Sequence, residues 1–160
     1  MQKQADFAAR RRAFRAAPDF IPQLNVEFLK LEKQIRSALP ALQAIRRKAN
    51  VSVRREGLTI VVSALGRGLT LRWYRPENIL GDACLFVTVW NRTVADVESA
   101  IGQPRKLLEK RFAYELAETG SAMFFDKDND QAYTSIDLSE ICLRYLVDLA
   151  RRSYFHWLHW

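Results

Sequence analysis

The chain has 160 residues, about the length of one domain, and is long enough to bury a substantial core. Hydrophobic residues make up 49% of it and charged residues 27%, with six glycines and five prolines, which excludes collagen-like, low-complexity and fully disordered chains. The net charge of +7 is uneven: residues 1–55 hold 13 basic and 4 acidic residues, a charge of +9 that predicts an anionic partner.

Residues 1–20 are expected to form a basic N-terminal arm or helix, ahead of a single α+β domain at 21–160. Helix-forming residues run from Phe7 to Ala17, and Pro18 should end the helix because the residue before a proline avoids helical geometry. We interpret the arginines of this segment as phosphate contacts, and a solvated terminus is the alternative. These arginines are Arg10, Arg11, Arg12 and Arg15.

A second, longer helix is predicted by apolar residues that recur at steps of four and three between Leu24 and Ala49. Pro40 should kink or break it near Ser37. The apolar seam favours packing against a sheet, and pairing of two subunits is the alternative. The interface residues of that alternative are Leu24, Phe28, Leu31 and Ile35. Near the end of the helix, Arg46, Arg47 and Lys48 are further predicted phosphate contacts.

From Val51 the apolar pattern changes to the period of two that is typical of strands. Val51 and Val53 alternate with polar residues up to a turn at Glu56–Gly57. Further strands are expected at Leu58–Leu65, Leu69–Arg75, Cys84–Trp90 and Arg111–Glu118, and as a hairpin of Ser121–Asp126 with Gln131–Ser135. Between these strands, Thr93–Leu108 is expected to form a short helix broken at Gly102.

The predicted sheet has a face on which aromatic and basic residues alternate. If Leu71 and Trp73 face the core, then Arg72 and Tyr74 point the other way. The same reasoning, applied to the strand at Cys84–Trp90, places Phe86, Trp90 and Arg92 on that face. Aromatic rings interleaved with arginines form a stacking platform for unpaired bases, with cations for the phosphates. A helix that covers this face is the alternative.

The last predicted helix begins at Asp137, which can cap it while Glu140 bonds back to the cap. It is apolar on most sides, which indicates that it is covered on more than one side. An aromatic segment that includes Trp157 and Trp160 follows and should pack on the core or on a partner. Together these elements predict an α+β fold, with an antiparallel sheet of about five to seven strands on which a long N-terminal helix and a long apolar C-terminal helix pack.

No familiar catalytic signature occurs, so no cofactor, metal or enzymatic activity is expected. Asp126, Asp128 and Asp130 have the spacing of a calcium loop, but Gln131 stands where the sharp turn needs glycine, which favours a polar hairpin tip. A weak divalent site there is the alternative. The chain has only two cysteines and no apolar run long enough to span a bilayer. It also begins without the hydrophobic core of a signal peptide. We therefore expect a cytoplasmic protein without a membrane span.

These observations lead to two functional hypotheses. The first is a non-enzymatic binding protein that contacts single-stranded nucleic acid through its basic N-terminal half and the aromatic and arginine-bearing sheet face. The alternative is a protein–protein adaptor or a chaperone-like homodimer. That alternative would use the Leu24–Ile45 seam and the aromatic C-terminus, and its arginines would serve solubility or an acidic protein partner.

Overall fold

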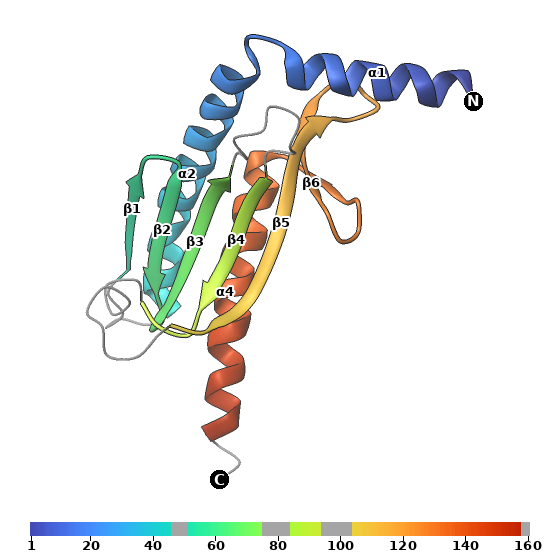
Figure 1. Cartoon of the computed structure of the whole chain (residues 1–160). Coiled ribbons are helices and arrows are strands. Elements are labelled where there is room, and N and C mark those ends of the chain that lie inside the picture. The colour runs from blue at the N-terminus through green and yellow to red at the C-terminus, as the bar shows by residue number, and fades with distance from the viewer. Residues whose placement is uncertain (46–50, 75–83, 94–103, 158–160) are drawn as a thin grey trace.

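The computed structural model describes residues 1–45, 51–74, 84–93 and 104–157, with the backbone alone described at 42–45 and 150–157. In this part of the chain two helices precede a sheet and one follows it (Figure 1). The helices are α1 (Gln2–Ala16), α2 (Phe20–Ile45) and α4 (Ser135–Trp157). The strands are β1 (Ser52–Glu56), β2 (Thr59–Ala64), β3 (Arg67–Tyr74), β4 (Cys84–Trp90), β5 (Lys106–Leu116), β6 (Ala122–Asp126) and β7 (Ala132–Tyr133).

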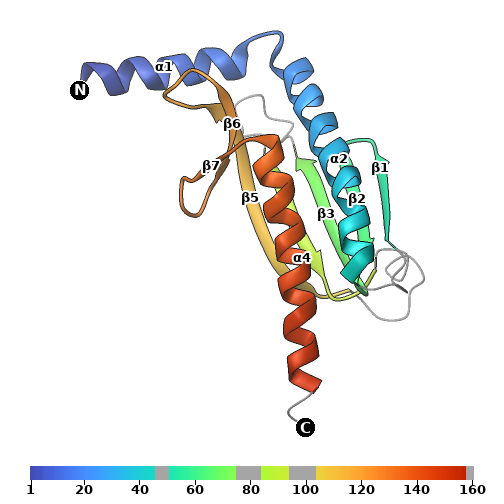
Figure 2. The same cartoon turned by 180° about the vertical axis from the view of Figure 1, so that it is seen from behind.

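The described strands form one seven-stranded sheet whose spatial order is the order of the chain, and every pairing is antiparallel. Helices α2 and α4 lie side by side on one face of this sheet, as both views show (Figures 1 and 2). The shorter α1 crosses the end of the sheet beside β5 and β6. The predicted α+β fold, with its antiparallel sheet and long terminal helices, is therefore confirmed.

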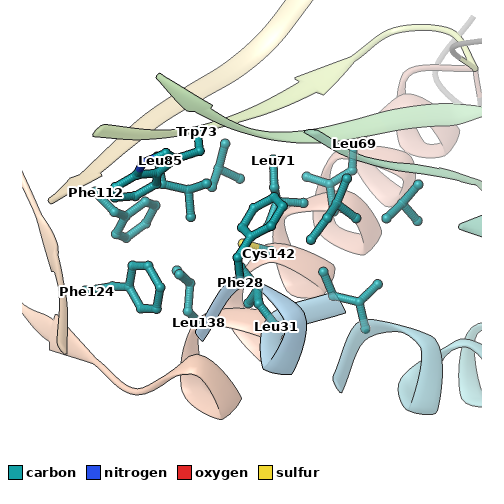
Figure 3. Packing of buried hydrophobic residues seen from close by; sticks show 14 of the residues in the cluster. Phe28, Leu31, Leu69, Leu71, Trp73, Leu85, Phe112, Phe124, Leu138 and Cys142 are labelled. Atoms are coloured by element: carbon teal, nitrogen blue, oxygen red, sulfur yellow. The ribbon is translucent and has the colours of Figure 1, made fainter. Parts of the chain in front are cut away.

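The core lies between the sheet and the α2–α4 layer (Figure 3). Leu31 of α2 and Leu71 of β3 have no exposed surface, and Leu138 and Cys142 of α4 pack in the same cluster. The apolar seam of α2 thus packs against the sheet, as the favoured interpretation expects. The residues that the dimer alternative assigned to a subunit interface are instead core residues that expose 3% of their surface or less: Leu24, Phe28, Leu31 and Ile35.

Helix α2 continues through Pro40 to Ile45, so the helix does not break there, and the kink stays a prediction. Pro40 removes a hydrogen bond to the carbonyl of Arg36. Because Pro40 lies on the exposed side of α2, water can solvate that carbonyl. The helix therefore tolerates the proline.

The free edge of the sheet at β1 is protected by α2. Arg36 donates a hydrogen bond to the Val53 carbonyl at 3.1 Å and pairs with Glu32 at 3.0 Å. Glu32 also pairs with Arg55 of β1 at 3.2 Å. An unpaired strand edge is a template for association with another chain, and a side chain that occupies its carbonyl blocks that pairing.

Strand β5 differs from the sequence-based expectation at its start. It begins at Lys106, so Lys106–Leu108, which was expected to end a helix, is extended. The spacing of Leu108, Phe112 and Leu116 suits a helix as well as a strand, and pairing with β4 decides between them. The remainder of the expected helix, residues 94–103, lies outside the described residues.

Helix α4 is capped by Thr134, three residues before the predicted cap at Asp137. The Thr134 hydroxyl accepts a hydrogen bond from the Asp137 backbone N–H at 3.2 Å. The Thr134 carbonyl accepts one from the Leu138 backbone N–H at 2.9 Å.

Substituting Thr134→Ala should lower the free energy of unfolding by about 1 kcal/mol, because the helix loses this cap. Asp137→Ala, the matched control, loses only a helix-dipole contribution of about 0.5 kcal/mol. Urea denaturation of both variants measures the difference, and a larger cost for Asp137→Ala would contradict this cap.

Candidate nucleic-acid interface

The sheet face opposite α2 and α4 is here called the outer face. Among the described helices only α1 reaches it, at the β5–β6 end (Figure 1). Cross-strand register determines which side chains share it. Arg72 of β3 lies opposite Phe86 of β4, and Phe86 lies opposite Arg111 of β5. Their neighbours Leu71, Leu85 and Phe112 have no exposed surface and face the core. The predicted alternation of buried and outward residues on β3 and β4 is therefore confirmed.

Arg72, Phe86 and Arg111 form a row across three strands, here called the cation–aromatic row. Both arginines are exposed, and neither side chain forms a hydrogen bond or ion pair with the described residues. Since neighbouring strands lie about 4.8 Å apart, the two arginines stand about 10 Å apart with the Phe86 ring between them. This row presents two cations to solvent, one on either side of an aromatic ring.

Tyr74 extends the row with a second ring. It is 51% exposed, and its ring meets that of Phe86 edge to face, with the centroids 6.1 Å apart at 87°. Such pairs hold their rings in a defined orientation while the phenol oxygen stays in water. The exposed Tyr74 ring offers a flat surface for a planar ligand.

Trp90 lies further along the outer face and is less accessible. Its indole N–H donates to the Thr70 hydroxyl at 2.9 Å, and the Lys106 ammonium lies 5.8 Å from its ring centroid. Lys106 is also paired with Glu109 at 3.2 Å. Trp90 therefore borders the platform, with one ring face covered by Lys106. Arg92, just beyond β4, is exposed.

Helix α1 is anchored to the sheet by the same arginines that were predicted to contact phosphates. The Arg11 guanidinium lies between the rings of Phe7 and Phe125, at 4.6 and 4.9 Å, and donates to the Leu116 carbonyl at 3.0 Å. Arg15 pairs with Glu115 at 3.2 Å. The other two arginines of this helix, Arg10 and Arg12, are exposed.

The remaining predicted site residues lie where the structure does not describe them. Arg46, Arg47, Lys48 and Trp160 are outside the described residues, and of Trp157 only the backbone is described. The interpretation of these five positions therefore stays a prediction.

The aspartates of the β6–β7 hairpin bond within the chain. Asp126 is 1% exposed, accepts the Asp128 backbone N–H at 2.8 Å and lies 3.8 Å from the Lys110 ammonium. Lys110 also lies 3.4 Å from Asp128, while the Asp130 N–H bonds to the Asp126 carbonyl. This is the pattern of a polar hairpin tip. Across the described ranges, no cluster of three His, Cys, Asp or Glu side chains is arranged to hold a metal ion.

Two further properties of the described residues bear on chemistry. None of the described helices is both long and apolar enough to cross a membrane. Cys142 is fully buried, and this burial raises the pKa of its thiol far above the ordinary value. A buried, protonated thiol is a poor nucleophile and acts here as a small apolar core residue.

Tyr114 packs against Phe14 of α1 and makes the stability of the fold depend on pH in the alkaline range. Burial raises the pKa of its phenol from 10.0 to about 12, and the nearby Glu27 carboxylate adds to the rise. The folded chain therefore holds this proton more tightly than the unfolded chain, so the stabilisation is complete below pH 10.0 and is lost as pH rises toward about 12. Between pH 10.0 and about 12, the melting temperature of Tyr114→Phe should therefore fall less than that of the wild type. Thermal melts at a series of alkaline pH values measure this, and parallel curves would contradict it.

Two residues of the outer face were not predicted from the sequence. Arg111 alternates with the buried Phe112, so its face could have been inferred, but its position beside Phe86 depends on the β4–β5 register. Phe125 sits in an apolar run with Phe124, and such a run does not indicate which residue faces the core.

The geometry of the outer face is the basis for inferring its function. No model of a known protein family matches the chain, and the searches of curated proteins and of solved structures gave no match either.

Proposed function

We propose that this chain is a binding protein that holds single-stranded nucleic acid against its outer face. The observation that carries the proposal is the cation–aromatic row of Arg72, Phe86 and Arg111, with the exposed Tyr74 ring beside it. An unpaired base presents a flat apolar surface that stacks on an aromatic ring, and its flanking phosphates attract cations. A duplex hides the faces of its bases, so this arrangement favours a single strand.

The charge around the row supports the same ligand. Arg10 and Arg12 of α1 are exposed near the end of β5 and β6. Exposed arginines at the margin of a binding face raise the local concentration of a polyanion and speed its association. They add affinity without selecting a base sequence.

Binding of a labelled single-stranded oligonucleotide, measured by fluorescence anisotropy across a salt series, tests the proposal. If Arg72, Arg111, Arg10 and Arg12 each contact a phosphate, log K should fall with log salt at a slope of about −3. The duplex of the same sequence should bind more weakly. Equal binding of the duplex, or no binding of the single strand at low salt, would contradict the proposal.

The alternative, a protein–protein adaptor or chaperone-like homodimer, predicts a different result, which sedimentation tests. Sedimentation at several protein concentrations shows whether the chain forms a dimer. A stable dimer that binds no oligonucleotide would favour the chaperone-like alternative. Since Leu31 and Ile35 are buried in the core, such a dimer would have to use other surfaces.

A further inference from the structure

A groove of about 550 Å³ lies between α1 and the β5–β6 end of the outer face. Its floor includes Ala113 and Phe125, and Arg11 and Arg15 of α1 form one side. Lys127 also lines the groove, and its backbone N–H bonds to the Arg111 carbonyl at 3.0 Å. The groove therefore combines an aromatic ring with three basic side chains from two separate elements. Its lining also includes three carboxylates, those of Glu115, Asp126 and Asp130.

Register makes this groove continuous with the cation–aromatic row. Tyr74, Cys84, Ala113 and Phe125 are successive partners across β3 to β6, so all four lie on the outer face. Three strand spacings separate Tyr74 from Phe125, a distance of about 14 Å. Ala113 also lies two residues beyond Arg111 on the same face of β5. A ligand on the row therefore reaches the groove by crossing the strands.

The Arg11 guanidinium is held in place before any ligand binds. The rings of Phe7 and Phe125 contact it from 4.6 and 4.9 Å, and Leu116 accepts its Nε–H. An ordered arginine loses little conformational freedom on binding a phosphate, which favours affinity. Of the three carboxylates that line the groove, Glu115 pairs with Arg15 and Asp126 with Lys110, while Asp130 lies on the exposed hairpin tip.

We infer that the groove is a second nucleotide subsite for the same single strand, an inference that rests on the proposed function. A base packs over Ala113 against the Phe125 ring, and its phosphate lies at Arg11. The strand runs across the sheet from Tyr74 to Phe125 and does not follow any one β-strand. A ligand too short to cover about 14 Å occupies the cation–aromatic row alone.

Affinity for a short and a long oligonucleotide tests the subsite. Phe125→Leu retains apolar bulk but removes the aromatic face, so it should weaken binding of a single-stranded octanucleotide about tenfold. Binding of a dinucleotide should not change. The slope of log K against log salt should also stay the same, because no cation has been removed. Phe125→Tyr restores the ring and should restore the affinity.

Met123→Leu, on the outer face of the same strand, is the matched control and should leave affinity for both oligonucleotides unchanged. Thermal melts confirm that each variant folds. Octanucleotide affinity that is the same for Phe125→Leu, Phe125→Tyr and the wild type would overturn the groove subsite while leaving the proposed function intact. A wild type that binds neither oligonucleotide would overturn both.

Discussion

A chain that carries Arg72→Ala together with Arg111→Ala should bind a single-stranded oligonucleotide about 60-fold more weakly near 50 mM salt. Both arginines are exposed and form no ion pair with the described residues, so their charge is available to phosphates. Two lost phosphate contacts on a single strand lower the magnitude of the salt slope by about 1.4. Anisotropy titrations of the variant and the wild type across the same salt series measure both quantities.

The control for this variant removes the same charge from the opposite layer of the molecule. Lys33 of α2 and Arg144 of α4 are exposed and lie away from the outer face. Lys33→Ala with Arg144→Ala should therefore leave the salt slope unchanged and reduce affinity only slightly, through the lower net charge. Equal losses in the two double variants would show that binding depends on total charge and not on the cation–aromatic row.

The second large effect concerns the core. Leu31→Ala on α2 should lower the free energy of unfolding by about 3 kcal/mol, because Leu31 is fully buried and its truncation leaves a cavity. The melting temperature should fall by about 10 °C. Leu29→Ala is the matched control on the same helix. Leu29 is 46% exposed, so the same substitution should cost less than about 0.5 kcal/mol.

Chemical denaturation of both variants measures these costs, and sedimentation measures their state of association. If Leu31 packs within its own chain, the cost of its truncation does not depend on protein concentration. A Leu31→Ala cost that falls on dilution would instead place this residue in a subunit interface, as the dimer alternative requires.

Much of the fold could be predicted because the helical and the strand periodicities of the apolar residues are both strong. The steps of four and three in α2 and the alternation in β3 and β4 correctly identify the residues that face the core, such as Leu31 and Leu71. The start of β5 could not be predicted, because Leu108, Phe112 and Leu116 fit either geometry and pairing with β4 decides between them. The cap of α4 was misplaced because Thr134 and Asp137 are both good capping residues, and Asp137 occupies the third helical position of a Thr-x-x-Asp pattern.

The candidate site could be predicted only in part, because its residues come together through the pairing of separate strands. Alternation shows that Arg72 and Tyr74 share a face, but only the register shows that Arg111 lies in line with Phe86. The charge pattern identifies the arginines of α1 as a group. It does not separate Arg11 and Arg15, which anchor the helix, from Arg10 and Arg12, because anchoring depends on Phe125 and Glu115 far along the chain.

The order of the strands has a consequence for how the chain folds. Each described strand pairs with its neighbours in sequence, so every hairpin can form from nearby residues at a low entropic cost of loop closure. The contact between α2 and α4 is different, since it joins elements separated by the whole sheet. Hairpins that form early would leave their apolar face in water until α4 closes over it. During synthesis the sheet would therefore need protection from self-association until the residues after β7 have left the ribosome.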